Sequence, residues 1–522
     1  MKKKSDNLAK NVGKISSGTF LSRISGLARD IVLTHFLGAT SVADSFGVAF
    51  VIPNMLRGLF GEGALSAAFI PLYTEFKEKK SKAETIQFAL NILSILIILL
   101  IILVGIGIVL APIIVKLIAP GFALEFQSLT SQLTQTLFPY LFLIGLTSVV
   151  IAILNAHSIF FLPSLSPMMF NLGIIIPAII YTTLKESSIE EKAFILAAGV
   201  LFGGICQLSV NLPLLRKIGY KFKFRINLKQ KEIKQVWQRM IPGIVGIGIR
   251  EINVVVDTIL ASVLAVGSVA ALQYGNRLMQ LPLGVFGIAI GTALLPLFSR
   301  YIANNQTDKL KKSLKDAFNL ILIIMLPIIA IILVMGRDMI SLIYLHGAFD
   351  EKNALPMTFA ALLFYSIGLV SHSSVRIFAS AFFALKNTKT PMKIAAITVV
   401  CNIILNIILM HFIKLKGLAL ATSISATIQA FILFFVLQKN IGKINFSNIL
   451  SNFLKICIIS ILLGFVCFYL NQITITSMLN WRILLFLKIL VIMIISSLIY
   501  FSGLKFLKVK SSQMLFDIFR RK

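Results

Sequence analysis

Charged residues are scarce in this chain and hydrophobic residues are abundant. Only 13% of its 522 residues are charged, 57% are hydrophobic, and the mean hydropathy is +0.93. This composition excludes a water-soluble globular protein and is typical of a polytopic membrane protein. Because long apolar stretches dominate, we expect an all-α fold, in which each helix satisfies its own backbone hydrogen bonds inside the bilayer.

The residues that usually carry catalysis or hold metals are also few. The chain has four cysteines and five histidines, without CxxC or Cys/His ligand spacing, and it has no Walker A loop. These absences disfavour a zinc site, a disulfide framework and ATP-driven chemistry. We therefore expect a protein that is not an enzyme, with no catalytic residues and no cofactor. The cysteines, which we interpret as small core residues, are Cys206, Cys401, Cys457 and Cys467.

Acidic residues are outnumbered by basic ones, 20 against 50, which gives a formal net charge of +30. Such an excess can indicate nucleic-acid binding, but here the basic residues lie in short segments between apolar stretches. The segment 216–239 is basic with interleaved aromatics, and we interpret it as interfacial, against anionic lipid, rather than as an RNA-binding element. We expect membrane lipids, and no nucleic acid, among the partners.

Fourteen apolar stretches are long enough to span a bilayer. They begin near residues 16, 44, 86, 134, 164, 193, 236, 268, 317, 354, 391, 417, 448 and 482. With both termini in the cytoplasm, the cytoplasmic segments hold 35 of the 50 basic residues, the outer loops hold 8, and the spans hold the rest. This asymmetry follows the positive-inside rule and favours fourteen spans with both ends inside.

Two pairs of similar segments indicate an internal duplication. SAAFIPLYTEF at 66–76 resembles GTALLPLFSRY at 291–301, and SPM at 166–168 resembles TPM at 390–392, at nearly the same offset. Short apolar strings also match by chance. The duplication hypothesis predicts two six-helix lobes in the same orientation, residues 1–218 and 219–440, with the basic segment 216–239 at their junction. Residues 441–522 would add two further spans and a cytoplasmic tail.

Seven basic residues fall inside the apolar stretches. Each costs at least about 2.5–3.5 kcal/mol at membrane depth, so a set of them predicts a shared water-filled cavity. Because guanidinium groups match phosphate geometry, we expect the cavity to hold a phosphate-bearing anion. The alternative is structural pairing of Arg29 with Asp44 and of Arg57 with Glu62. The seven are Arg23, Arg29, Arg57, Arg250, Arg277, Arg376 and Lys488.

Helix breaks accompany these arginines. Pro53 and three glycines surround Arg57, and Pro282 with Gly284 follows Arg277. Breaks at membrane depth are tolerated where the backbone faces protein or a cavity, so both segments fit a cavity wall.

A separate set of polar residues is a candidate cation site. Asp257 is an isolated carboxylate in an apolar span, Asn402 and Asn406 share a helix face at i,i+4 spacing, and Thr422 lies in the next span. Such oxygen ligands suit Na⁺ or a proton relay better than Ca²⁺. The alternative is ordinary hydrogen bonding between helices.

Several motifs resemble one family. GTFLSRISGLARDIVLTHFLGA, ADSFGVAFVIPNMLRGLFGEGALSAAFIPLY and YGNRLMQLPLGVFGIAIGTALLPLFS, together with fourteen spans, are similar to the MurJ (MviN) family of bacterial lipid II flippases, in the multidrug/oligosaccharidyl-lipid/polysaccharide exporter superfamily. The resemblance implies two six-helix lobes around a cationic cavity, with the last two spans forming a groove for the polyprenyl tail. The substrate-binding residues it implies are Arg23, Arg29, Asp30, Asp44, Arg57 and Arg277.

The resemblance also implies a sodium site in some members. The matching positions are Asp257, Asn402, Asn406, the Leu418 carbonyl and Thr422. Asn406 stands where such members have a second carboxylate, which is a departure from the family pattern.

The resemblance implies a function. We expect a monomer in the bacterial cytoplasmic (inner) membrane that flips lipid II, the lipid-linked peptidoglycan precursor, from the inner to the outer leaflet. The mechanism would be alternating access, driven by membrane potential or by a Na⁺ or H⁺ gradient. The alternatives are export of another lipid-linked oligosaccharide and a non-transporting cell-wall scaffold.

Overall fold

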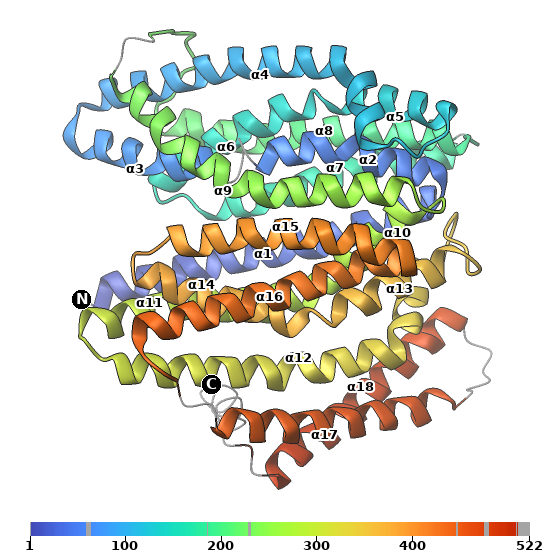
Figure 1. The fold of residues 1–522 in the computed structure, drawn as a ribbon. Helices are drawn as coiled ribbons and strands as arrows, with labels where there is room; N and C mark the ends of the chain where they lie inside the picture. Colours follow the sequence, from blue (N-terminus) through green and yellow to red (C-terminus); the bar gives the residue numbers. More distant parts are fainter. Residues whose placement is uncertain are drawn as a thin grey trace. The chain divides into compact units, whose positions relative to one another are not determined.

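The computed structural model describes residues 2–58, 64–184, 186–227, 231–444, 447–473, 480–507 and 509. In these residues all regular secondary structure is helical, which confirms the expected all-α class (Figure 1). The chain forms two compact units, Met1–Ala270 with His346–Phe349, and Ala271–Leu345 with Asp350–Lys522. The helices that precede residue 263 are α1 (Lys2–Leu37), α2 (Ser41–Arg57), α3 (Ala64–Lys79), α4 (Lys82–Ile118), α5 (Leu124–Leu137), α6 (Tyr140–Ala156), α7 (Phe161–Leu184), α8 (Ile189–Lys217) and α9 (Lys231–Ser262).

The remaining helices follow in the second half of the chain. They are α10 (Ser268–Pro282), the π-helical segment η2 (Leu283–Ile288), α11 (Ala289–Ala303), α12 (Thr307–Tyr344), α13 (Ala354–Ser366), α14 (Leu369–Ala384), α15 (Lys389–Ile413), α16 (Leu415–Ile441), α17 (Ser447–Asn471) and α18 (Trp481–Phe506). At Pro282, where the sequence predicts a break, the α-helix α10 gives way to the π-helical segment η2, and the helix continues into α11. The predicted break is therefore a change of helix type and not an end of the helix. The break predicted after Arg57 lies mostly outside the described residues, because α2 ends at Arg57 and α3 begins at Ala64.

Ten helical segments of the described chain are long and apolar enough to cross a membrane, and α13 with α14, bent by 43°, makes an eleventh. The other three predicted spans correspond to α1, to α2 with α3, and to α9. These helices carry Arg23, Arg29, Arg57 and Arg250, so the segments that depart from simple apolar character include those with arginines at membrane depth. The protein is therefore a multi-pass membrane protein, and fourteen spans stays a prediction.

The first unit is built around long, closely packed helices. Its core includes Phe69 and Tyr73 of α3 and Phe88 of α4, with α9 packed on α3 and α4. Helices α1 and α8 pack on α7. Because α9 lies with this unit, the compact units divide at Ala270, whereas the sequence repeat predicts lobes that divide at 218. The compact units do not test the division that the sequence repeat predicts, so the two six-helix lobes stay a prediction.

The α7–α8 contact depends on two glycines. A methyl group added at Gly173 would lie 2.3 Å from the Gly203 Cα, so the two backbones touch there. Small residues at helix contacts allow such close approach in membranes, where dispersion replaces the hydrophobic effect between helices.

We expect Gly173→Ala to destabilise the protein by about 1–3 kcal/mol, because the added methyl forces α7 and α8 apart. Gly105→Ala in α4 is the matched control: nothing lies within 4 Å of its added methyl, and alanine favours a helix by up to about 1 kcal/mol over glycine. Thermal unfolding of the purified variants in detergent measures both. Equal melting temperatures would contradict the close-contact interpretation.

The second unit repeats one feature of the first. Helix α15 packs on α16, and the TPM motif lies at the start of α15 as SPM lies near the start of α7. Helices α17 and α18 pack on each other and on α12, as Figure 1 shows. The Tyr500 hydroxyl donates to the Ile323 carbonyl over 2.7 Å, which fixes α18 to α12.

Lys488 has a structural role within this second unit. Its Nζ donates to the carbonyl oxygen of Asn471, the last residue of α17, over 2.5 Å. The Asn471 amide donates in turn to Asp338 Oδ2 over 2.6 Å. An ammonium group at a helix C-terminus complements the helix dipole, so Lys488 differs from the arginines with which the sequence groups it.

Candidate substrate-binding residues

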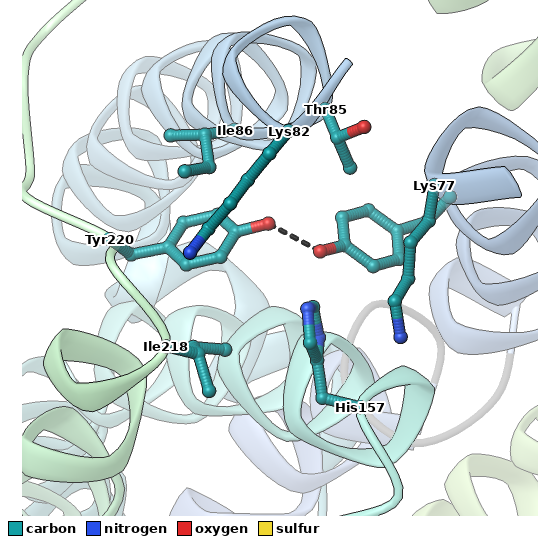
Figure 2. Close-up of a pocket in the computed structure, with 8 residues that line it drawn as sticks. Lys77, Lys82, Thr85, Ile86, His157, Ile218 and Tyr220 are labelled. Atoms are coloured by element: carbon teal, nitrogen blue, oxygen red, sulfur yellow. Dashed lines mark hydrogen bonds between the residues drawn. The ribbon is translucent and has the colours of Figure 1, made fainter. Parts of the chain in front are cut away.

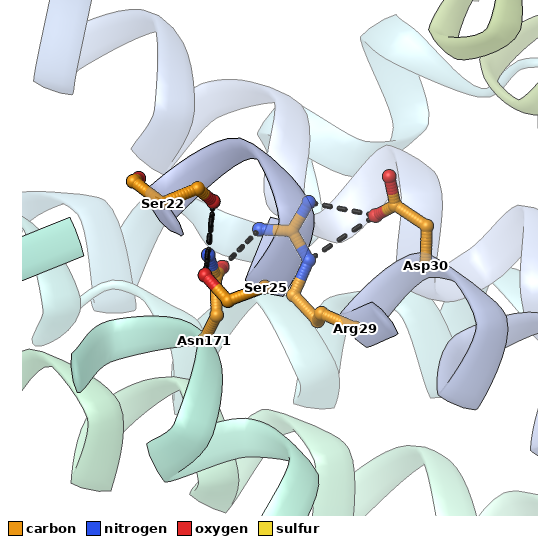
Figure 3. A network of polar contacts seen from close by, with 5 residues as sticks. All are labelled: Ser22, Ser25, Arg29, Asp30 and Asn171. Carbon is orange, nitrogen blue, oxygen red and sulfur yellow. Dashed lines mark hydrogen bonds and ion pairs between the residues drawn. The ribbon is translucent and has the colours of Figure 1, made fainter. Parts of the chain in front are cut away.

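Arg29 lies in α1 within a network of polar side chains (Figure 3). Its Nη2 and Nε donate to Asp30 Oδ1 over 2.7 and 3.2 Å, and its Nη1 donates to Asn171 Oδ1 over 3.2 Å. The side chains of Arg29 and Asp30 are only 14% and 7% exposed. The adjacent pair thus neutralises a charge that would otherwise be costly within the membrane.

Asn171 of α7 is held in turn by α1. Its amide nitrogen donates to Ser25 Oγ over 2.9 Å and to the Ser22 carbonyl over 3.3 Å. Ser25 Oγ donates to the same carbonyl over 2.9 Å. Because each link fixes the next, the guanidinium orientation is set before any ligand arrives.

Arg29 retains donor capacity. A guanidinium group has five N–H donors, and the contacts to Asp30 and Asn171 use three. In the described part of the chain, one N–H on each terminal nitrogen therefore lacks a protein acceptor. Two such donors are what a bidentate contact to a phosphate requires.

Asp44 is buried and contacts backbone rather than arginine. Its Oδ2 accepts from the Gly267 N–H over 2.6 Å and its Oδ1 from the Ala270 N–H over 2.8 Å. A carboxylate that accepts the first N–H groups of a helix stabilises its N-terminus, here that of α10. The alternative pairing of Arg29 with Asp44 is therefore wrong, since Asp30 is the carboxylate beside Arg29.

The surroundings of Arg57 include a carboxylate from α9. A methyl group added at Gly58 would lie 3.4 Å from Glu251 Oε1, so this buried carboxylate borders the end of α2. The alternative partner, Glu62, lies outside the described residues, as does the side chain of Arg250. Arg57 itself is half-buried.

The other arginines are exposed on their own units: Arg23 on α1, Arg277 on α10 and Arg376 on α14. Beside Arg277, Gln280 Nε2 donates to Asn276 Oδ1 over 2.5 Å. Within a bilayer, an exposed charged side chain has to face water or an ionic ligand, which agrees with the predicted cavity wall.

The candidate cation residues of the second unit form one polar cluster. Asn406 Nδ2 donates to Asn402 Oδ1 over 2.9 Å, which confirms that this pair shares a helix face. Asn402 Nδ2 donates to Ser425 Oγ over 3.0 Å, and Thr422 Oγ1 donates to the Leu418 carbonyl over 3.1 Å. The bond from Asn402 to Ser425 joins α15 to α16, which also fits the alternative of hydrogen bonding between helices.

Asp257 belongs to the first unit. The Asn253 amide, one turn earlier in α9, donates to Asp257 Oδ2 over 3.1 Å, and the carboxyl group is half-buried. No group of three or more His, Cys, Asp or Glu side chains with metal-site geometry occurs among the described residues.

Some members of these networks were not predicted from the sequence, among them one that joins α7 to α1 and one that joins α16 to α15. Asn171 and Ser425 are polar residues in apolar helices, and that contrast is the signal that could have identified them. Their partners lie in other helices, 142 and 23 residues away, so the sequence alone does not pair them.

The chain is similar to proteins of one family along most of its length. A family model described as "Lipid II flippase MurJ" matches residues 33–492. A "Probable lipid II flippase MurJ" from Buchnera aphidicola subsp. Schizaphis graminum (strain Sg) is 32% identical over 523 residues, 99% of this chain and 100% of that one. A "Lipid II flippase MurJ" from Burkholderia cenocepacia is 30% identical over 439 residues, 83% and 84% of the two chains.

Solved structures are also similar to this chain. One described as "Lipid II flippase MurJ, inward closed conformation" superposes with a TM-score of 0.77 and 29% identity, covering 94% of this chain and 99% of that chain. An inward-facing multidrug resistance MATE family transporter of the MOP superfamily gives a TM-score of 0.68 at 16% identity, with 81% and 94% covered. The second likeness shows the fold alone.

Proposed function

This chain belongs to the MurJ family of lipid II flippases, and we propose that it carries lipid II from the cytoplasmic to the outer leaflet by alternating access. It is a transporter rather than an enzyme. The headgroup would cross in a water-filled cavity while the polyprenyl tail stays in lipid. Members of this fold have been seen in inward-facing and outward-facing forms, as the MATE family structures are described.

The observation that supports this proposal is that hydrogen bonds fix the orientation of the Arg29 guanidinium group. Asp30 and Asn171 fix its orientation, and two N–H donors remain for a ligand. We propose that Arg29 binds the diphosphate of lipid II, that Arg23, Arg57 and Arg277 add positive charge along its path, and that Asp30 and Asp44 position this machinery. Diphosphate oxygens accept several charge-assisted hydrogen bonds, which favours arginine over neutral donors.

The tail would lie along α17 and α18. Both helices expose large apolar side chains, among them Phe465 and Phe468 of α17 and Leu498 of α18, each at least 49% exposed. An exposed apolar face of this kind suits contact with a polyprenyl chain in the bilayer.

Transport would be driven by the membrane potential, by an ion gradient or by both. Exporting a dianion from an inside-negative cell gains about 4–5 kcal/mol per 100 mV, at about 2.3 kcal/mol per charge. Na⁺ or H⁺ at Asp257, or at the cluster of Asn402, Asn406, Leu418 and Thr422, would add a second gradient. We propose a monomer in the bacterial inner membrane with both termini in the cytoplasm, as the basic loops favour.

The test is transport by the purified chain. Proteoliposomes containing fluorescent lipid II are assayed for movement between leaflets, with and without an imposed potential and a Na⁺ gradient. We expect movement in protein-containing vesicles, faster when the potential favours anion movement toward the outer leaflet. If another lipid-linked oligosaccharide moves and lipid II does not, that oligosaccharide is the substrate. If neither moves, a non-transporting scaffold is favoured.

A further inference from the structure

A pocket of about 420 Å³ lies in the first unit, separate from Arg29, among the ends of α3, α4, α6 and α8 (Figure 2). Its lining is rich in hydrogen-bonding and basic side chains. They are Tyr73, Lys77, Lys82, Thr85, His157 and Tyr220. These residues lie at helix ends and in connecting loops on the face that the positive-inside rule assigns to the cytoplasm.

Both lysines lack an acidic partner within the described residues. The nearby carboxylates are engaged by other lysines, Glu75 with Lys79 at 2.8 Å and Glu84 with Lys80 at 4.0 Å. The Lys77 ammonium donates only to the Ala156 carbonyl, over 3.0 Å. The pocket therefore holds more positive than negative charge.

The positive charges of Lys77 and Lys82 both affect the His157 side chain. Burial lowers the pKa of His157, a hydrogen bond to the Ile153 carbonyl opposes this, and the charges of Lys77 and Lys82 lower the pKa further. His157 is therefore neutral near pH 7, and the net charge of the pocket comes from the lysines. In the view of Figure 2, the Lys82 side chain crosses Tyr220, and Lys77 lies on the other side of the view.

The tyrosine pair supplies a further donor. The hydroxyl groups of Tyr73 and Tyr220 hydrogen-bond to each other, and burial raises the pKa of Tyr220, so the hydroxyl remains protonated. Their mutual bond uses one of two hydroxyl hydrogens. The other is available to an acceptor in the pocket that both tyrosines line.

The chain leaves the pocket as an amphipathic segment. After Tyr220, the backbone is held on α4 by Arg225 N–H to Ser94 Oγ over 3.0 Å and by Asn227 N–H to Asn91 Oδ1 over 2.8 Å. In this segment basic and apolar residues alternate, and all six side chains are exposed: Lys221, Phe222, Lys223, Phe224, Arg225 and Ile226. Aromatic and basic side chains together are typical of segments at the lipid–water interface.

We propose that this pocket binds a phosphate group, carried either by an anionic lipid headgroup or by a soluble phosphate. Lys77 and Lys82 bind the anion, and the tyrosine pair donates to it. The neighbouring segment places the pocket at headgroup depth, which accounts for a lipid source. The proposal concerns a site apart from lipid II transport and stands whether or not the chain flips lipid II.

The test uses the full chain in phosphatidylcholine nanodiscs. Inorganic phosphate is titrated by calorimetry at constant ionic strength, and retention of phosphatidic acid is counted by native mass spectrometry. The pocket variant is Lys77→Gln with Lys82→Gln. The control is Lys79→Gln with Lys80→Gln, which removes the same charge from the same segment outside the pocket. Lys77→Arg with Lys82→Arg preserves the charge.

We expect the pocket variant to lose at least about tenfold in affinity for one of the two probes, while the control and arginine variants change less than about twofold. Loss of phosphatidic acid retention alone identifies a lipid headgroup, and loss of phosphate binding alone identifies a soluble ligand. Absence of binding by the wild type, or equal loss in pocket and control variants, overturns the proposal. If the double variant unfolds on heating far below the wild type, Lys77→Gln alone is judged by the same criteria.

Discussion

Arg29→Ala is expected to abolish lipid II transport. Two donors to the diphosphate would be lost, and each hydrogen bond to a charged group contributes about 1.5–3 kcal/mol. At about 1.4 kcal/mol per tenfold, the transport rate at low substrate should fall by two orders of magnitude or more. The measurement is lipid II movement in proteoliposomes, normalised to inserted protein.

A loss of transport could also arise from misfolding, because Arg29→Ala removes the guanidinium group that is paired with the buried Asp30 carboxylate. Arg29→Ala with Asp30→Asn removes both charges and should restore thermal stability without restoring transport. Asn171→Ala should give an intermediate loss, since it releases the guanidinium but keeps its charge. Normal transport by the double variant would exclude Arg29 as a substrate-binding residue.

Asp44→Ala is expected to destabilise the first unit strongly. Its two oxygens accept from buried backbone N–H groups at 2.6 and 2.8 Å, and losing both should cost about 3–6 kcal/mol. The backbones are also in contact here: a methyl group added at Gly267 would lie 2.2 Å from the Ala39 carbonyl oxygen, so no rearrangement easily supplies another acceptor. Thermal unfolding in detergent measures the loss.

Thr40→Val is the matched control for Asp44→Ala. Thr40 caps α2, the helix that carries Asp44, and its hydroxyl makes neutral hydrogen bonds only: it accepts from the Ala43 N–H at 3.3 Å and donates to the Leu37 carbonyl at 2.8 Å. Its loss should cost about 1 kcal/mol. If the two variants melt at the same temperature, the contacts between Asp44 and the start of α10 contribute little.

The features that the sequence predicted correctly are local. The all-α class follows from the apolar stretches, and the Asn402–Asn406 contact follows from i,i+4 spacing on one helix. The change from α-helix to π-helix after Pro282 lies where the sequence predicts a break, although the helix does not end there. Each depends on residues within about one or two helical turns, where backbone geometry fixes the outcome.

The features that the sequence did not predict are contacts between segments far apart in the chain. Asn171 is 142 residues from Arg29, and Gly267 is 223 residues from Asp44. The sequence alternative paired Arg29 with Asp44, whereas helix packing places Asp44 at the Gly267 and Ala270 N–H groups and leaves Asp30 beside Arg29. The packing of α9 with the first unit is decided in the same way.

The most direct test of the account is lipid II exposure on the outer leaflet of bacteria depleted of their own flippase. Cells expressing this chain are compared with cells expressing Arg29→Ala with Asp30→Asn at equal membrane abundance. We predict restored exposure and growth with the wild type alone. Absence of exposure from a well-inserted wild type would contradict lipid II transport, and equal exposure from both would contradict the role of Arg29.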